Sequence, residues 1–202
     1  MKSKCFAGIA VVAGALLLSA SAPAQDFSAQ GISHGGAGNT ITSKVFASGG
    51  KVRIESQEEN VPAVERGSYS ILDLMQQASY VVNPGRKTVL QQSPVQARTN
   101  LAQFNGDPCA QRNQGASNSG TCGKAGTETI NGRSADRYEV RQSLRGQPYN
   151  VNIWVDARLH IVLKMEMNGA AMYELRDVHE GPQPAALFEI PADYQKVTLQ
   201  GR

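Results

Sequence analysis

The sequence predicts a mainly β fold in which one antiparallel sheet curls to protect its apolar face, with very little helix. Eight or nine short segments alternate apolar and polar residues, which is typical of strands with one solvated face. Turns rich in glycine, asparagine and proline separate these segments. Such short turns favour antiparallel neighbours, because parallel strands need crossovers of about a dozen residues or more.

Residues 1–24 have the features of a secretory signal peptide. A basic head of Lys2 and Lys4 precedes an apolar run from Cys5 to Leu18, and an A-x-A site ends at Ala24. The apolar run is shorter than the roughly 20 residues that cross a bilayer. We therefore expect cleavage near Ala24, a bacterial periplasmic or secreted location, and no membrane-spanning segment in the mature chain.

Charge and length limit what the mature chain can do. Cleavage would remove two lysines and no acid, which lowers the formal net charge from +3 to +1. A nearly neutral chain without a basic run offers no electrostatic attraction for nucleic acid. The remaining chain suits a single domain, which we expect over residues 40–202 and in monomeric form.

The start of the mature chain predicts a loose segment followed by a hairpin. Residues 25–39 are small, polar and rich in glycine, so we expect a flexible N-terminal segment. Two strand-like runs then flank Gly49 and Gly50, and glycines that accept a positive φ predict a hairpin there.

Residues 68–91, SYSILDLMQQASYVVNPGRKTVLQ, predict a three-stranded meander. The three apolar runs are rich in β-branched and aromatic residues and are separated by MQQA and NPGR. In NPGR, Pro84 sets φ and Gly85 relaxes the position that follows it, which predicts a tight turn.

A short helix is predicted at about residues 94–104. Ser93 is a good N-cap, Pro94 suits the first helical position, and an apolar stripe follows at helical spacing: Ala97, Leu101 and Phe104. We expect this stripe to pack on the sheet, since packing stabilises most short helices.

Residues 105–126 have almost no apolar content and predict a surface loop. The two cysteines of the mature chain, Cys109 and Cys122, lie in this loop, and an even count in an exported chain favours a disulfide. A redox or metal pair is less favoured, because the spacing is not CxxC and no histidine is close in sequence. The tied loop could be a lid over a binding face or an excursion without a function.

The chain then returns to strands. Asn131–Gly132 and Asn168–Gly169 are two-residue hairpin signals. Between them, YNVNIWVD and HIVLKMEM alternate, which places one set of apolar residues on a common face: Val151, Ile153, Val155, Ile161, Leu163, Met165 and Met167. Val162 is the exception to this alternation.

No catalytic or metal-binding constellation can be assembled from the sequence. The histidines His34, His160 and His179 are widely separated and lack a metal-ligand spacing. Neither a G-x-S-x-G elbow nor a phosphate-binding loop is present. Five carboxylates could meet in space, although each occupies a turn or a polar strand position where solvation is expected: Asp73, Asp136, Asp156, Glu166 and Asp177. We predict no enzymatic activity, metal or cofactor, and a hydrolase with scattered carboxylates is the least favoured alternative.

The apolar face of the sheet is the remaining candidate for a function. We predict that it binds a hydrophobic ligand through seven residues: Val52, Ile54, Val151, Ile153, Ile161, Leu163 and Met165. In one interpretation the predicted helix covers this face completely and the face is an ordinary core. In the other, one short helix is too small for so wide a sheet and leaves a groove for a hydrocarbon chain.

The order of these motifs resembles the LolA-like superfamily of bacterial envelope proteins, and most of all its uncharacterised secreted members. The resemblance covers roughly residues 40–198 and lies in KVRIE, the meander, NGRSADRYEV, IWVD with VLKMEM, and the ending LFEIPADYQKV. It implies an unclosed half-barrel whose concave side is partly covered by one or two short helices, with LFEIPADY crossing the sheet. Arg53 lies where relatives often carry an arginine, but the neighbouring aromatic and proline pattern of the family is absent.

The resemblance and the apolar face together favour a periplasmic, non-enzymatic binding protein. Its ligand would be a lipid, a lipoprotein acyl chain or another hydrophobic molecule held on the concave face. The alternative is an envelope module that recognises a protein partner or senses stress with the same scaffold and carries no ligand.

Overall fold

The computed structural model describes residues 25–35, 38–57, 62–104, 106–109, 120–144 and 146–198, so the expected signal peptide lies outside the described part. The strands are β1 (Phe27–His34), β2 (Thr40–Ser48), β3 (Lys51–Ser56), β4 (Tyr69–Asp73), β5 (Ala78–Asn83), β6 (Thr88–Gln91), β7 (Gly120–Ile130), β8 (Arg133–Leu144), β9 (Gln147–Asp156), β10 (Val162–Met167), β11 (Ala170–Glu180) and β12 (Gln195–Thr198). The helical elements of the described part are α1 (Pro94–Leu101) and short 3-10 turns at η2 (Ala63–Glu65), η3 (Ala102–Phe104) and η4 (Ala185–Phe188).

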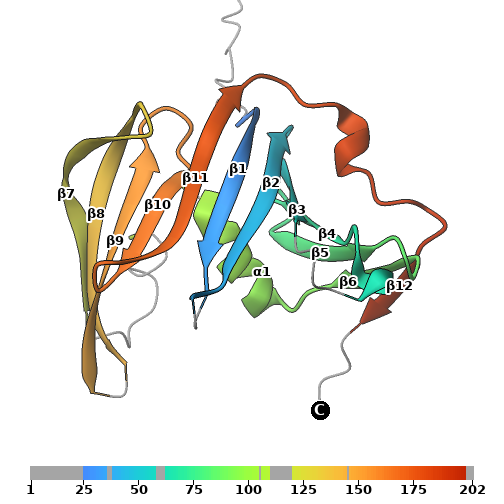
Figure 1. The fold of residues 1–202 in the computed structure, drawn as a ribbon, viewed down its shortest axis with the longest axis horizontal. Helices are drawn as coiled ribbons and strands as arrows, with labels where there is room; N and C mark the ends of the chain where they lie inside the picture. Colours follow the sequence, from blue (N-terminus) through green and yellow to red (C-terminus); the bar gives the residue numbers. More distant parts are fainter. Residues whose placement is uncertain are drawn as a thin grey trace, which may run out of the picture.

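All twelve strands form one curved sheet in the order β12-β6-β5-β4-β3-β2-β1-β11-β10-β9-β8-β7 (Figure 1). The sheet is not closed, because β12 and β7 are its two edges. Neighbouring strands are antiparallel except that β12 runs parallel to β6, with Gln195 opposite Thr88. The mainly β fold with a single unclosed sheet and little helix, predicted from the sequence, is therefore confirmed.

The expectation of a flexible segment at residues 25–39 is wrong, because residues 27–34 form β1 near the middle of the sheet. β1 pairs with β2 on one side and with β11 on the other, so its backbone groups are hydrogen-bonded on both edges. Phe27 is completely buried in the core. The small residues that suggested mobility instead allow close packing: a Cβ on Gly31 would lie 2.6 Å from Ser43 Oγ.

The predicted hairpin turns are confirmed. Asn131 and Gly132 both have positive φ, at 49° and 77°, and Asn168 and Gly169 repeat this pattern. Gly85 in the NPGR turn serves a different purpose from the one expected. Its φ is not positive, but a Cβ at this position would lie 2.6 Å from the carbonyl oxygen of Val64, so Gly85 allows η2 to approach the turn.

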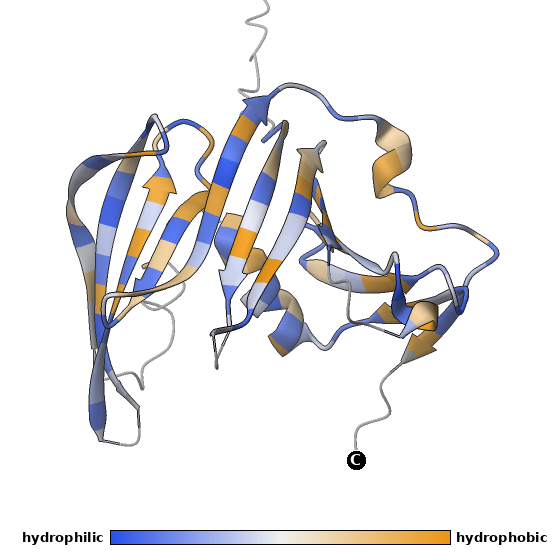
Figure 2. Cartoon of the chain, viewed as in Figure 1, coloured by the Kyte–Doolittle hydropathy of each residue, from blue (hydrophilic) through white to orange (hydrophobic). Residues whose placement is uncertain are grey.

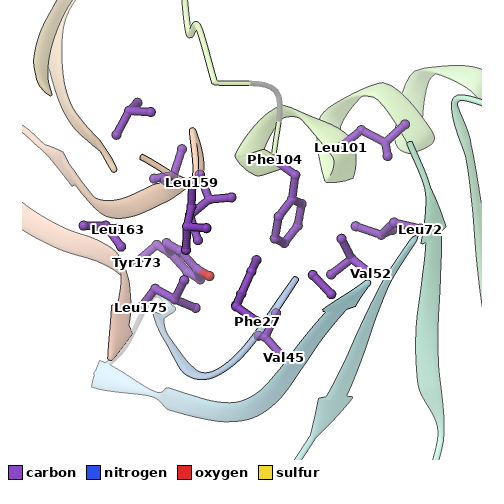
Figure 3. Close-up of a cluster of buried hydrophobic side chains, with 14 of the residues drawn as sticks. Phe27, Val45, Val52, Leu72, Leu101, Phe104, Leu159, Leu163, Tyr173 and Leu175 are labelled. Atoms are coloured by element: carbon purple, nitrogen blue, oxygen red, sulfur yellow. The ribbon is translucent and has the colours of Figure 1, made fainter. Parts of the chain in front are cut away.

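The helix begins and packs as the sequence predicts. Ser93 is the N-cap, its hydroxyl accepts a hydrogen bond from the Gln96 N–H at 3.3 Å, and Pro94 is the first helical residue. The predicted stripe is buried, with Ala97, Leu101 and Phe104 in the main core. Figure 3 shows Phe104 directed from the end of the helix into a cluster that includes Phe27, Val52, Leu72 and Leu159.

The two faces of the sheet differ along its length. Along β8 to β11, polar and apolar residues alternate (Figure 2), and ion pairs such as Lys164–Glu166 and Arg176–Glu174 join side chains two residues apart on one strand. Around β4 to β6, the face opposite the helix carries a second apolar cluster of Tyr69, Ile71, Val82 and Val89, against which Ile190 and Tyr194 pack. The C-terminal segment therefore crosses the sheet on this outer face, as expected for LFEIPADY.

The predicted disulfide between Cys109 and Cys122 is present, with Cα atoms 5.5 Å apart. The expectation of one loop over residues 105–126 is only partly correct. Residues 120–126 belong to β7, which pairs with β8 along its length. Residues 105 and 110–119 of that loop lie outside the described part of the chain.

Candidate functional site

A pocket of about 310 Å³ lies on the concave side of the sheet, between the end of the helix and strands β9 to β11. Its floor is formed by Ile153, Val162, Met165 and Tyr173. On the opposite side it is lined by Ala102 and Pro108 with the more polar Thr99, Gln103 and Asp107. Most of the surface that a ligand would touch is therefore hydrocarbon.

Strand register places the floor residues in one row. Ile153 of β9 lies opposite Met165 of β10, and Met165 lies opposite Tyr173 of β11, so the three side chains share a face. The register of β10 shifts between Val162 and Lys164, which inserts one extra residue into the strand. This irregularity brings Val162 to the same pocket as Met165, and it explains why Val162 breaks the alternation in the sequence.

Two sets of contacts fix the side of the pocket that lies opposite its floor. The disulfide fixes Cys109, which follows Asp107 and Pro108 directly, and the Cys109 N–H donates to Asp107 Oδ1 at 2.7 Å. On the other side, the Gln25 amide donates to the carbonyl oxygens of Leu159 and Phe104, at 2.8 Å and 3.3 Å. The disulfide thus ties one wall of the pocket to β7.

Two of the seven predicted ligand-binding residues, Ile153 and Met165, line the pocket. The other five do not: Val52, Ile161, Leu163 and Val151 are buried, and Ile54 is half-buried against the main core. The sequence pattern selected the face on which this pocket lies, but it did not separate the filled part of the face from the open part. It also missed Tyr173, since the AAMYELRDV run was assigned only as a strand.

Burial dominates the chemistry of Tyr173. Its side chain lies among hydrocarbon groups of the main core (Figure 3), and this burial raises the pKa of the hydroxyl above its ordinary range. The hydroxyl therefore stays protonated and neutral across the physiological pH range. Tyr173 is the polar group of the otherwise apolar pocket floor.

A second, more open cleft of about 800 Å³ lies on the outer face, between β3 to β5 and the C-terminal segment. Arg53 is central to it: Nε donates to Glu55 Oε1 at 2.7 Å and Nη1 donates to the carbonyl oxygen of Leu187 at 2.9 Å. Tyr69, Ile71 and Tyr80 line its floor. This cleft mixes charged, aromatic and apolar groups, whereas the concave pocket is mainly apolar.

The carboxylates considered as catalytic candidates have structural partners. Asp73 accepts hydrogen bonds from the N–H groups of Met75 and Gln76, and Asp156 pairs with Arg133 and accepts from the N–H groups of Arg158 and Leu159. Both are buried, so the expectation that they are solvated is wrong. They are buried because each closes a turn.

The remaining acids are spread over the sheet. Asp136 pairs with Lys124, Glu166 pairs with Lys164, and Asp177 is exposed on β11 with a positive φ.

Within the described residues, no group of three or more histidine, cysteine or acidic side chains is arranged to hold a metal ion. In the same residues, no helix is long and apolar enough to span a bilayer.

These features define the class of protein: an open antiparallel half-barrel with a small apolar pocket under its helix. No protein-family model matches the sequence, and no curated protein matches it. Among solved structures, an uncharacterized conserved protein from Thermus thermophilus is 12% identical over 85% of this chain and 89% of its own, with a TM-score of 0.48. MucB of Pseudomonas aeruginosa, solved with MucA, is 15% identical over 86% of this chain and 58% of its own, with a TM-score of 0.47.

The structural neighbours also include a domain assigned to an outer membrane lipoprotein-sorting protein of Vibrio parahaemolyticus. It is 16% identical over 74% of this chain and 68% of its own, with a TM-score of 0.33. Because these TM-scores are below 0.5, we base the function on this chain's own residues.

Proposed function

We propose that the protein binds a hydrophobic ligand, such as a lipid or an acyl chain, in the concave pocket and does not convert it chemically. The observation that carries this proposal is a pocket of about 310 Å³ with an apolar floor on the face that the sequence pattern selects. This volume is near the lower end of the range for small-molecule sites. Each buried methylene would contribute about 0.8 kcal/mol, so a chain of moderate length gives useful affinity.

A periplasmic or secreted location is part of the same proposal. The Cys109–Cys122 disulfide is typical of proteins that work in an oxidising compartment. The signal-peptide features expected in residues 1–24 favour export in the same way. A non-enzymatic role is supported by the partners of the acids, since Asp73 and Asp156 are occupied in closing turns.

Displacement of a fluorescent apolar probe, N-phenyl-1-naphthylamine, tests the proposal. Met165→Trp would fill the pocket and should weaken probe binding at least about tenfold, whereas Met75→Trp adds the same indole at a site that is 83% exposed and should leave binding unchanged. Equal binding by wild type and Met165→Trp would show that the pocket is not the site. Native mass spectrometry of gently purified protein should reveal a copurifying lipid.

A second candidate function, recognition of an envelope protein segment, is favoured by the outer cleft. Its open shape and the aromatic rings of Tyr69 and Tyr80 suit a peptide better than a buried acyl chain. Under this alternative, a specific partner would bind wild type and Met165→Trp equally well. Binding of that partner would be lost in the Tyr80→Ala variant, which removes the aromatic ring from the cleft floor.

A further inference from the structure

The Tyr173 side chain is buried, and among the described residues its hydroxyl has no hydrogen-bond partner. The residue is only 6% exposed and lines the concave pocket. Within the described residues the Tyr173 hydroxyl makes no hydrogen bond. Its oxygen atom is nevertheless not completely buried. It therefore keeps contact with open space, and the open space beside Tyr173 is the pocket.

A buried hydroxyl that lacks a partner is unfavourable, because it loses its hydrogen bond to bulk water and gains nothing in return. Most buried polar atoms in native proteins are satisfied, so an orphan donor in a pocket calls for a partner. Burial keeps this hydroxyl protonated, so it can donate over the whole physiological pH range. An acceptor that enters the pocket can therefore supply the partner that this hydroxyl lacks among the described residues.

The charge of the lining restricts what that acceptor can be. Among the described residues of the lining, Asp107 is the single acid, and none is lysine, arginine or histidine. A carboxylate ligand would have to give up its hydration without a counter-ion among the described lining residues. An uncharged carbonyl, ester or ether oxygen does not meet this obstacle.

We propose that the concave pocket selects an uncharged, largely apolar molecule of moderate chain length whose carbonyl-type oxygen accepts a hydrogen bond from Tyr173. Free fatty-acid anions are disfavoured, because the part of the lining that the structure describes holds no cation. This inference rests on the proposed function, because it assumes that the pocket takes up apolar ligands. It adds a specific contact that orients the ligand, with the hydrocarbon part against Ile153 and Met165.

Three ligands of similar length test this assignment: methyl nonanoate, decanoate and undecane, each measured by displacement of N-phenyl-1-naphthylamine. Wild type should bind the ester more tightly than the anion. Tyr173→Phe keeps the ring and removes the donor, so ester affinity should fall about tenfold while undecane affinity stays unchanged. Ester binding that is unaffected by Tyr173→Phe, or decanoate that binds as tightly as the ester, would overturn the inference.

The two proposals fail in different ways. If wild type binds neither the ester nor undecane, the hydrophobic-ligand function fails and the Tyr173 contact fails with it. If both ligands bind and Tyr173→Phe changes neither affinity, only the Tyr173 contact fails. Should Tyr173→Phe not fold, the ¹³C shift of carbonyl-labelled methyl nonanoate bound to wild type decides: a downfield shift relative to hydrocarbon solvent indicates a hydrogen bond, and an unchanged shift contradicts it.

Discussion

The guanidinium of Arg53 lies over the ring of Tyr69, with its central carbon 3.5 Å from the ring centroid. The two residues belong to neighbouring strands, β3 and β4, and the same guanidinium reaches the carbonyl oxygen of Leu187 in the C-terminal segment. The Arg53 side chain is only 16% exposed. One side chain thus joins two strands to the segment that crosses them.

We expect Arg53→Ala to lower the free energy of unfolding by about 2 to 3 kcal/mol. The change removes a largely desolvated cation–π contact and a charged hydrogen bond to a carbonyl. Amide hydrogen exchange at residues 184–190 should accelerate, because Leu187 loses its link to the sheet. Arg176→Ala, which removes an exposed guanidinium paired with Glu174, is the control and should lower stability much less than Arg53→Ala. Equal effects of the two variants would contradict this role of Arg53.

Gly85→Ala should destabilise the protein by about 1 to 3 kcal/mol, because the added methyl would lie 2.6 Å from the carbonyl oxygen of Val64. Backbone must move to relieve this contact, so the turn or η2 has to shift. Gly123→Ala is the matched control, since a Cβ there has no atom within 4 Å. Urea unfolding of both variants measures the difference, and a Gly85→Ala variant as stable as Gly123→Ala would disprove the close approach.

Replacing both Cys109 and Cys122 with serine should lower stability by roughly 3 kcal/mol while the sheet stays folded. The disulfide closes a short stretch of chain at the edge of the sheet, whereas the core depends on other strands. Because Asp107 and Pro108 lose their anchor, probe affinity should also fall several-fold. Circular dichroism and probe titration measure the two effects. Loss of the β signal would show that the disulfide is needed for the whole fold.

Asp156 should stabilise the folded protein at neutral pH, and this contribution should be lost in acid. Burial opposes its ionisation, but hydrogen bonds from Arg133 and from the N–H groups of Leu159 and Arg158 outweigh burial and lower the pKa of Asp156. A carboxyl with a lowered folded-state pKa stabilises the protein above its unfolded pKa, near 3.8, and this stability is lost as the pH falls through the folded-state value.

Asp156→Asn should therefore cost about 1 to 3 kcal/mol at pH 7, and the difference from wild type should shrink at pH 3. The asparagine keeps an oxygen for the turn, and Arg133 keeps its second partner, Glu180. Asp193→Asn, at an exposed pair with Lys87, serves as the control and should change stability by less than about 1 kcal/mol. If the stability difference between wild type and Asp156→Asn were the same at pH 7 and pH 3, the proposed role of the ionised Asp156 would be refuted.

Local signals made much of the fold predictable. The Asn–Gly turns, the Ser93 cap and the alternation along β9 and β10 each depend on residues close in sequence. β1 could not be found in this way, although its partner β2 follows directly in the chain, because most of its residues are small or polar and glycine-rich sequence follows it. Such residues have low strand propensity, so the pairing of β1 with β2 and β11 is not visible in its own composition.

The candidate site was predictable only as a face. Alternation places Ile153 and Met165 on the apolar side, but it does not show which part of that side the helix fills. That depends on where the disulfide holds Pro108 and on the register shift that turns Val162 inward. The outcome combines the two interpretations of the sequence: most of the face is core, as at Val52 and Leu163, and a small part is open.

The last prediction concerns alkaline pH. Burial raises the pKa of Tyr173 above its unfolded value of about 10, so the unfolded chain ionises first as the pH rises. The stability that the neutral hydroxyl provides is complete below pH 10 and is lost above it, up to the folded-state pKa.

Phenylalanine cannot ionise. The free energy of unfolding of Tyr173→Phe should therefore rise relative to wild type by about 1.4 kcal/mol for each pH unit above 10. Urea unfolding at pH 8 and pH 11 measures this change, with Tyr149→Phe, on β9, as the matched removal of a hydroxyl outside the core. A constant difference between wild type and Tyr173→Phe at the two pH values would mean that the hydroxyl reaches bulk water. The same result would remove the reason to expect that a ligand must satisfy it.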